Sequence, residues 1–327
     1  MGVTAAVLAI DAGNSKSDVA LVGEDGSVLA TSRGPGFQPP RVGVTAALDV
    51  LADTVREALG SAGVPAGRVR HVSACLANAD FPSEEAELAA AVHARAWGGT
   101  TEVRNDTFAI LRAGVDEPRG VAVVCGAGIN CVGMLPDGRT ARFPSIGRIS
   151  GDWGGGSGLA EEAMWWAARA EDGRGEPTAL ARALPEHFGL PSVYALVEAL
   201  HLGRIPAERR HELTPVLFAV AAAGDPVARS LVERQAAEVA VLATVALDRL
   251  GLLDAEVPVL LGGSVLAARH PRLNGRVTEL LAVKAPRATV HVVTEPPVLG
   301  AALLGLDRLE APATARDRLR AHWARRP

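Results

Sequence analysis

The sequence has few lysines, few cysteines and no excess of positive charge, and each shortage excludes a class of protein. Only Lys16 and Lys284 are lysines among its 33 Lys and Arg residues, and the net charge is -4. A chain with this charge has no overall positive field that would draw it to nucleic acid or to an anionic membrane surface. The three cysteines, Cys75, Cys125 and Cys131, form no CxxC pair, which favours a reducing compartment over a disulfide framework.

Long apolar runs and several familiar catalytic motifs are also absent. No apolar run reaches about 18 residues, and the first one lacks a basic leader and a cleavage site, so we expect a cytoplasmic protein with no targeting or membrane segment. The sequence contains no GxxxxGK[ST] loop, no strand-GxGxxG-helix unit with a downstream acid, no HExxH motif and no zinc-spaced Cys/His cluster. These absences argue against P-loop, dinucleotide-binding and zinc enzymes.

The length and hydrophobic content predict an α/β protein of two domains. With 327 residues, 48% of them hydrophobic, the chain can bury two cores of ordinary size, and a cleft between two domains is the expected arrangement. We place the domains at residues 1–118 and 119–327, with helical insertions in the second and a last helix that can return to the first. A cluster of arginines is expected on a solvated terminal helix and tail: Arg316, Arg318, Arg320, Arg325 and Arg326.

The first polar turn is the most informative local feature. The apolar run from Val7 to Ile10 stops at Asp11, and the turn Gly13-Asn14-Ser15-Lys16 precedes a second apolar segment, which predicts two strands joined by a hairpin. Glycine permits a positive φ, so the backbone N–H groups of this turn could converge on a phosphate, with side-chain donors from Ser15 and Lys16. An ordinary hairpin with solvated polar residues explains the same pattern.

A second strand–glycine–strand unit lies about a hundred residues further along the chain. Residues 121–124 predict a buried strand, Gly126-Ala127-Gly128 a turn, and residues 131–135 the returning strand, which suggests an internally duplicated architecture of mixed α/β layers. The other predicted elements are strands at 69–76, 102–104, 257–261 and 289–293, and helices at 45–59, from Ser83, at 107–113, 158–171, 177–188, 193–200, 213–222 and 226–250, after Ser264, and at 297–306.

Asp106 stands where a predicted strand passes into a helix, in the segment Arg104-Asn105-Asp106-Thr107. Open α/β folds expose reactive groups at such a position, and a carboxylate there can accept the proton of a substrate hydroxyl during phosphoryl transfer. A helix N-cap is the alternative, because aspartate caps helices well. The segment alone leaves both roles open.

Three further glycine segments each allow two roles. Gly126-Ala127-Gly128-Ile129-Asn130 could wrap a second face of a triphosphate or form a tight hairpin. The segment from Ser150 to Gly158 has five glycines in nine residues and predicts a close-approach loop, in which Asp152 hydrogen-bonds sugar hydroxyls or orients the loop. Gly262-Gly263-Ser264 suits a nucleotide base and ribose, or simply opens a helix.

The order of these segments is similar to that of a known family. They are Asp11-Ala12-Gly13-Asn14-Ser15-Lys16, Asn105-Asp106, Gly126-Ala127-Gly128-Ile129-Asn130, Gly147 through Asp152 to Gly158, Gly262-Gly263-Ser264 and Pro297-Val298-Leu299-Gly300-Ala301-Ala302. Together they resemble the N-acetylglucosamine kinase branch of the BadF/BadG/BcrA/BcrD ATPase family, within the actin, Hsp70 and sugar-kinase superfamily, over roughly residues 7 to 305. The resemblance implies two ribonuclease-H-like (actin-like ATPase) domains flanking a nucleotide cleft that closes on a sugar, and a homodimer.

The resemblance also implies an ATP-dependent hexosamine kinase that uses Mg²⁺ and phosphorylates the 6-hydroxyl of N-acetylglucosamine. Asp106 would be the base that activates the sugar hydroxyl, and Asp11 would hold Mg²⁺ through water. The nucleotide would be contacted by two turns and an adenosine motif, namely Gly13, Asn14, Ser15, Lys16, Gly126, Ala127, Gly128, Gly262, Gly263 and Ser264.

By the same resemblance, the sugar would be contacted by Gln38, Asn105, Asp106, Asn130 and Asp152. Gln38 is a departure, because the corresponding loop in these kinases commonly offers an Asn to the sugar. The family's glycine-threonine-glycine turn reads Gly126-Ala127-Gly128 here and lacks a hydroxyl. Glucosamine, N-acetylmuramic acid and other hexose derivatives therefore stay open as substrates.

Two other functions fit the same fold. A dehydratase-activator-like ATPase would drive electron transfer from an iron–sulfur cluster between two subunits, and it needs accessible cysteines, whereas Cys125 and Cys131 lie in predicted strands of the second unit. A nucleotide-binding regulator would bind ATP without sugar-dependent release of ADP.

Overall fold

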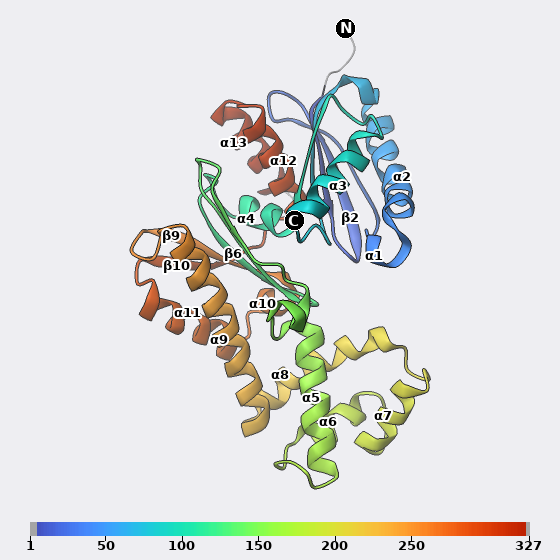
Figure 1. Ribbon diagram of the computed structural model, residues 1–327, viewed down its shortest axis with the longest axis vertical. Coiled ribbons are helices and arrows are strands. Elements are labelled where there is room, and N and C mark those ends of the chain that lie inside the picture. Colours follow the sequence, from blue (N-terminus) through green and yellow to red (C-terminus); the bar gives the residue numbers. More distant parts are fainter. Residues whose placement is uncertain (1–4, 325–327) are drawn as a thin grey trace. The chain divides into compact units, whose positions relative to one another are not determined.

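The structure, a computed structural model, describes residues 5–324, in which the strands form two five-stranded sheets. The strand order is β3-β2-β1-β4-β5 in one sheet and β10-β9-β6-β7-β8 in the other. Counted along the chain, both orders are the same: the first strand is central, the second and third extend the sheet on one side, and the fourth and fifth extend it on the other. The predicted α/β class and internal duplication are therefore confirmed by the sheet topology (Figure 1).

The first sheet combines an antiparallel meander with two parallel strands. β1 (Ala5–Ala12), β2 (Lys16–Val22) and β3 (Val28–Pro35) pair antiparallel, whereas β4 (Val69–Leu76) and β5 (Thr100–Asn105) run parallel to β1. Within residues 5–324, six helices from the two ends of the chain belong to the same compact unit as this sheet. They are α1 (Pro39–Val42), α2 (Val44–Ala62), α3 (Pro82–His93), α4 (Thr107–Ala113), α12 (Pro297–Arg308) and α13 (Ala313–Ala324), with a 3₁₀ turn at Ala66–Arg68.

The second sheet carries a long helical insertion between its third and fourth strands. The strands are β6 (Gly120–Cys125), β7 (Ile129–Met134), β8 (Thr140–Arg142), β9 (Val257–Gly262) and β10 (Ala288–Val292). The helices are α5 (Gly155–Glu171), α6 (Leu180–His187), α7 (Val193–His201), α8 (Leu213–Ala222), α9 (Pro226–Arg249), α10 (Gly263–Ala267) and α11 (Pro271–Lys284), with 3₁₀ turns at Gly147–Ser150 and Ala207–Glu212. Within residues 5–324 no single helix is long and apolar enough to cross a membrane, and the one pair that meets the requirement together, Ala207–Ala222 with Pro226–Arg249, is bent by 112° at its break.

Helices cover both faces of the first sheet, α2 on one face and α12 on the other (Figure 1). Ile10 belongs to the same buried cluster as Leu48 of α2. Val7 lies on the opposite face, where Gly305 has no Cβ and so lets α12 approach the strand. Because side chains alternate along a strand, Asp11 shares the α12 face with Val7, and burial on both faces explains why β1 has a continuous apolar sequence.

The chain separates into two compact groups of residues. One group contains residues 5–122, 132–144 and 293–324, and the other contains residues 123–131 and 145–292. The division passes through β6 and β7, so the turn between these strands belongs to the second group. The domain boundary predicted between residues 118 and 119 stays a prediction.

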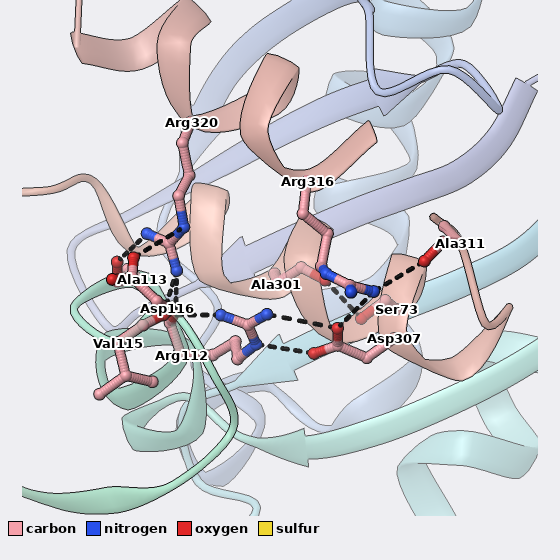
Figure 2. A network of polar contacts seen from close by, with 10 residues as sticks. All are labelled: Ser73, Arg112, Ala113, Val115, Asp116, Ala301, Asp307, Ala311, Arg316 and Arg320. Carbon is pink, nitrogen blue, oxygen red and sulfur yellow. Dashed lines mark hydrogen bonds and ion pairs between the residues drawn. The ribbon is translucent and has the colours of Figure 1, made fainter. Parts of the chain in front are cut away.

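A network of arginine side chains joins α4, α12 and α13 (Figure 2). Arg112 is fully buried, and it donates from Nε and Nη2 to Asp307 at 2.6 and 3.3 Å and from Nη1 to the carbonyl of Val115 at 2.7 Å. From α13, Arg320 donates to the carbonyl of Ala113 at 2.8 Å. Arg320 thus satisfies a carbonyl at the C-terminal end of α4 that has no partner inside the helix, and Arg112 satisfies the carbonyl of Val115, two residues beyond that end.

The arginines near the C-terminus are therefore more than a solvated tail. Arg316 lies 3.7 Å from Asp307, and Arg320 caps α4, so the prediction of a solvated terminal helix is wrong for these two residues. Arg316 joins α13 to Asp307 of α12, whereas Arg320 joins α13 to α4, the helix that follows Asp106. The remaining members of the predicted cluster are Arg318, which is exposed and pairs with Asp25, and Arg325 and Arg326, which lie outside the described residues.

Several helix starts differ from the sequence prediction. α3 begins at Pro82, one residue before the predicted start at Ser83, because the side chain of Glu84 accepts the N–H group of Phe81 at 2.9 Å and fixes the helix start there. Ser83 therefore lies within the N-terminal turn of α3. Elsewhere α5 begins at Gly155, α6 begins at Leu180, and α11 is a helix additional to those predicted.

Candidate functional site

Two acidic side chains lie at the carboxyl edge of the first sheet. β1, β4 and β5 are parallel neighbours, and their register pairs Ala12 with Leu76 and Leu76 with Asn105. Asp11 is the penultimate residue of β1, and Asp106 follows the last residue of β5. Because the carboxyl ends of parallel strands meet at one edge, the structure brings these two predicted site residues to the same edge of the sheet.

Asp11 is only 9% exposed and faces further negative charge. Burial is the main cause that raises the pKa of Asp11 to about 8; the charges of Asp106 and Asp18 add to the rise, and Lys16 opposes it. The nearby cations are engaged with Asp18, which lies 3.1 Å from Lys16 Nζ and 2.6 Å from Arg33 Nε. A buried carboxyl group with two acidic neighbours is a place where an added cation would be favourable.

Asp106 does not cap the helix that follows it. Among the described residues, no cap hydrogen bond comes from the Asp106 side chain, and Asn105 Oδ1 accepts the N–H group of Thr107 at 3.0 Å. The N–H group of Asp106 donates to the carbonyl of Leu76 at 3.2 Å, which ties the residue to the end of β4. Burial raises the pKa of Asp106 to about 6. In residues 5–324, Asp106 thus makes no side-chain cap hydrogen bond to α4, while hydrogen bonds from the backbone and side chain of Thr107 lower its pKa against the effect of burial.

Asn105 and Asp80 belong to a polar network, most of which the sequence did not reveal. Asn105 is 3% exposed; its Nδ2 donates to Asp80 at 2.9 Å, and its N–H group donates to Glu85 at 2.9 Å. Glu85 in turn accepts from Arg142 Nη1 at 2.5 Å. Burial, with added repulsion from nearby carboxylates, raises the pKa of Asp80 to about 6. Asp80 follows closely after β4, and a carboxylate soon after a strand end was the signal available in the sequence.

The first turn, between β1 and β2, is held through its carbonyl oxygens. The carbonyl of Gly13 accepts the N–H group of Phe37 at 2.9 Å, and the carbonyl of Asn14 accepts from Gln38 Nε2 at 2.6 Å. Among the described residues, none accepts a hydrogen bond from the backbone N–H groups of Asn14 or Ser15. The turn thus offers two successive N–H donors, while Gln38, predicted to contact a sugar, has its amide nitrogen engaged with the turn.

The second turn, between β6 and β7, is also held through its carbonyl oxygens. The carbonyls of Gly126 and Ala127 accept the N–H groups of Gly156 and Ser157, in the first turn of α5, at 2.7 and 2.9 Å. In the described part of the chain, nothing accepts a hydrogen bond from the N–H groups of Ala127 or Gly128. Both turns therefore keep their carbonyls occupied and leave two consecutive N–H groups without a partner.

The glycines of the two turns are not required by the folded chain itself. Gly13 has no positive φ, and a Cβ added there would meet only the carbonyl of Lys16, at 3.6 Å. A Cβ added at Gly126 or Gly128 would meet nothing within 4 Å. The space beside these glycines is open to a bound group, which is consistent with the predicted phosphate contacts.

Asn130 and Asp152, which were predicted to touch the sugar, both hold loop segments. Asp152 Oδ2 accepts the N–H group of Gly147 at 3.1 Å and the Ser150 hydroxyl at 2.5 Å. Asn130 Oδ1 accepts the Ser145 hydroxyl at 2.6 Å. Of the two roles left open for Asp152, the structure contains the one that orients its own loop, and contact with a sugar stays a prediction.

The predicted adenosine motif lies at the end of β9. Gly262 is the last residue of that strand, and Ser264 is exposed in the short helix α10. Gly263 has a φ of +80°, and a Cβ added there would lie 2.5 Å from the backbone of Cys125. The glycine therefore lets α10 start against the end of β6, next to the second turn, and its contact with adenosine stays a prediction.

The donors beside Asp11 fit a magnesium ion that is also bound by substrate. In residues 5–324, no group of three or more His, Cys, Asp or Glu side chains could hold a metal ion alone. Mg²⁺ is commonly bound by one or two carboxylates together with phosphate oxygens and water. Asp11 and Asp106 supply carboxylates at one sheet edge, and their mutual repulsion would be relieved by such an ion.

Comparison with known proteins identifies relatives of this chain. The family model of the BadF/BadG/BcrA/BcrD ATPase family matches residues 8–305. The N-acetylmuramic acid/N-acetylglucosamine kinase of Clostridium acetobutylicum is 25% identical over 217 residues, which cover 66% of this chain and 71% of that enzyme. The N-acetyl-D-glucosamine kinase of Dictyostelium discoideum is 25% identical over 209 residues, or 63% of this chain and 65% of the relative, just under two thirds of its length.

Solved structures show the same fold. A candidate N-acetylglucosamine kinase from Chromobacterium violaceum has a TM-score of 0.70 at 22% identity and matches 93% of this chain and 99% of its own. A ROK family glucokinase from Streptomyces griseus, solved with glucose and AMPPNP, has a TM-score of 0.53 at 18% identity and matches 93% and 98% of the two chains. The predicted fold class, two actin-like ATPase domains, is confirmed by these similarities.

Proposed function

The chain belongs to the BadF/BadG/BcrA/BcrD ATPase family, and we propose that it is an ATP-dependent hexosamine kinase. The proposed acceptor is the 6-hydroxyl of N-acetylglucosamine, and the names of two curated relatives support an amino sugar. The observation that carries the proposal is the Asp106 carboxyl group, which is not used as a cap and lies with Asp11 at one sheet edge.

Asp106 is the general base in this proposal. With a pKa of about 6, its carboxyl group is ionised at neutral pH and accepts the proton of the sugar hydroxyl. The hydroxyl oxygen forms a bond to the γ-phosphorus while the bond to the bridging oxygen breaks, and ADP leaves with that electron pair. The products are a sugar phosphate, ADP and a proton, which is first held on Asp106.

The two turns bind the phosphates of ATP in this proposal. Four N–H groups that have no partner in the described part of the chain, those of Asn14, Ser15, Ala127 and Gly128, supply fixed donors that need no rearrangement when a phosphate arrives. Lys16 adds a positive charge, since its side chain is 53% exposed while its Nζ lies 3.1 Å from Asp18. Gly262, Gly263 and Ser264 contact the adenosine.

Asp11 would hold Mg²⁺ through water, and Asp106 lies at the same edge. When bound, the ion neutralises charge on the β- and γ-phosphates. The protein's own part is to keep the Asp11 carboxyl group buried in β1, so that its orientation is set by the sheet.

The sugar is held by residues that also shape their own loops. Asp152 uses Oδ2 to hold its loop and would offer Oδ1 to a hydroxyl, whereas Gln38 would offer Oε1. Asn130 would contact the sugar, and Asn105 would orient it beside Asp106. Glucosamine and N-acetylmuramic acid are the alternative acceptors, and the second is named for the Clostridium relative.

A dehydratase-activator role is less well supported than kinase activity. Cys75, Cys125 and Cys131 are all buried free thiols, and burial raises the pKa of Cys125 to about 12. Thiols in this state are poorly placed to ligate a cluster at a subunit surface. The proposal includes a cytoplasmic location and a homodimer, as expected for a kinase of this family.

The test is ADP release with Mg²⁺-ATP in the presence of N-acetylglucosamine, glucosamine, N-acetylmuramic acid, N-acetylmannosamine or glucose. One amino sugar should drive turnover, and Asp106→Asn should lower kcat about 10²-fold or more, as loss of a general base predicts. Asp248→Asn, which changes an exposed carboxylate on α9, is the control and should keep full activity. If the protein binds ATP but none of these sugars drives the release of ADP, the kinase function is refuted and a regulator is indicated.

A further inference from the structure

The first residues of α5 support the second turn, between β6 and β7. The N–H groups of Gly156 and Ser157 hold two carbonyls of the turn, and a Cβ added at Gly155 would lie 2.5 Å from the backbone of Gly128. Gly155 also has a φ of +73°, which favours glycine. Any shift of this helix start therefore moves the turn whose N–H groups are proposed to bind phosphate.

Gln235 of α9 holds this helix start from the other side. Its side chain is completely buried, and Oε1 accepts the N–H group of Gly155 at 3.0 Å. Gly154 has a φ of +97°, and a Cβ added there would overlap Gln235 Oε1 at 2.0 Å. The amide group of Gln235 thus occupies the space that the missing side chain of Gly154 leaves free, and no larger residue fits at either position without a shift.

The amide nitrogen of Gln235 is an unusual feature of this contact. Nε2 is buried and has no hydrogen-bond partner among the described residues. Its orientation follows from the bond to Gly155, since only the oxygen can accept an N–H group. A buried donor without a partner destabilises a fold, and a leucine would avoid that cost, so packing alone does not account for glutamine at this position.

Arg234, the residue before Gln235 in α9, contacts the loop that contains Asp152 and Trp153. The guanidinium group of Arg234 lies 4.1 Å from the ring centre of Trp153, and Trp153 Nε1 donates to Glu162 of α5 at 3.2 Å. Trp153 directly follows Asp152. Two consecutive residues of α9 therefore contact the loop on both sides of Gly154, one toward the Asp152 segment and one toward the second turn.

We propose that Gln235 is a positioning residue that sets the second turn, through the N-terminal turn of α5, for binding the phosphates of ATP. The proposal rests on the kinase function for its catalytic readout only. Gln235 touches neither substrate nor the reacting atoms; it acts through Gly155, and Arg234 acts in the same way on Trp153. Thr214 Oγ1, which donates to the carbonyl of Gly156 at 2.6 Å, gives the same helix start a further support.

Gln235→Leu tests this proposal, since it removes the acceptor for the N–H group of Gly155 and keeps a side chain of similar size. We expect KM for ATP to rise about tenfold or more, with a smaller change in KM for the sugar, because the phosphate turn is displaced while the Arg234–Trp153 contact remains. Gln235→Glu keeps an acceptor oxygen and should restore KM for ATP toward that of the wild type. Thr244→Ala, which removes a hydroxyl bonded to the carbonyl of Ala240 within α9, is the control and should change neither constant.

Hydrogen exchange provides a readout that does not depend on activity. The amides of Gly155, Gly156 and Ser157 should exchange faster in Gln235→Leu than in the wild type and in Thr244→Ala. If Gln235→Leu does not fold, Gln235→Asn, which withdraws the acceptor by one methylene, should show the same changes to a smaller extent. A folded Gln235→Leu protein with unchanged exchange and unchanged KM for ATP overturns the proposal, whereas a wild type that releases no ADP with any sugar overturns the kinase function and leaves the exchange test in force.

Discussion

The turns Gly13–Lys16 and Gly126–Gly128 take equivalent positions in the two sheets, after the central strand of each, yet they are supported differently. The first turn is held by a loop: Phe37 and Gln38 donate to its carbonyls. The second is held by a helix: the first N–H groups of α5 donate to its carbonyls. In both turns, two consecutive N–H groups have no partner among residues 5–324, so the same donor arrangement occurs in unlike surroundings.

The comparison also shows where glycine is needed. Within the turns, Gly13 and Gly128 could carry a Cβ without meeting any atom closer than 3.6 Å. In the supports, a Cβ at Gly36 would lie 2.1 Å from the carbonyl oxygen of Asn14, and a Cβ at Gly155 would lie 2.5 Å from the backbone of Gly128. Glycine is thus required by the fold in the supporting segments, whereas in the turns it leaves room for a ligand.

The largest effect is expected from filling the support of the second turn. Gly155→Ala should lower the free energy of unfolding by about 2–5 kcal/mol, because overpacking adds to the strain of a left-handed backbone. Gly36→Ala should cost about 1–3 kcal/mol, since its φ is not positive and only the overlap contributes. Denaturant unfolding measures both changes, and Gly158→Ala, with open space around its Cβ, is the matched control in α5. A larger loss of stability at position 36 than at position 155 would contradict the added cost assigned to the left-handed backbone of Gly155.

The next largest effect is expected in the pH dependence of kcat/KM. The carboxyl groups with a raised pKa, Asp11 and Asp106, lie at the carboxyl edge of the sheet that carries the first turn. If Asp106 is the base, kcat/KM should fall about tenfold per pH unit below pH 6 and level off above it, since only the ionised form accepts a proton. A measured profile with no inflection near pH 6 would remove Asp106 from that role.

The stability of the compact unit that contains Asp11, residues 5–122, 132–144 and 293–324, should depend on pH through this carboxyl group. Its pKa is about 8 in the folded chain, against an ordinary value of 3.8 for an aspartate in water, so the folded state binds the proton more tightly. The resulting stabilisation is complete below about pH 4 and is lost as the pH rises through 8. Without Mg²⁺, the melting temperature should therefore fall between pH 5 and pH 8, and Asp11→Asn should flatten that fall. An equal slope in the variant would show that other groups cause it.

The smallest effect on stability is expected from substitutions in the turns themselves. Gly13→Ala and Gly128→Ala should change the free energy of unfolding by less than about 0.5 kcal/mol, because the new methyl groups meet open space. Both should raise KM for ATP about tenfold, equivalent to about 1.4 kcal/mol of binding, if phosphate approaches these glycines. Unchanged KM in one variant alone would restrict phosphate binding to the other turn.

Local patterns predicted many elements of this fold correctly. The strand at 69–76 and the helix at 213–222 have the predicted bounds, and the helix predicted from 226 begins there, with Asp225 accepting the N–H group of Ala228 at 2.8 Å as its cap. These features depend on neighbouring residues only, through side-chain alternation, helical periodicity and capping. Asp11 and Asp106 were found in the same way, as carboxylates at strand ends.

Features that depend on distant segments were missed or misjudged. Arg112 gave no sign that Asp307 would pair with it, and Arg320 was expected in solvent because its partners on α4 lie far away in sequence. Gln235 occupies an apolar helical pattern and shows no motif, since its partner is a glycine 80 residues away. Such contacts are set by how helices pack, which single-sequence periodicity does not specify.

The sequence by itself determined the α/β class, the duplicated strand–glycine–strand units and the identity of the acidic strand ends, because alternation, turn chemistry and residue type act locally. Only the tertiary structure decided that Asn105 pairs with Asp80 and Glu85, that the carbonyls of both turns are occupied, and that burial raises the pKa of Asp11 and Asp106. The physical reason is that hydrogen-bond partners and desolvation come from segments brought together by folding, and neither can be read from a single stretch of chain.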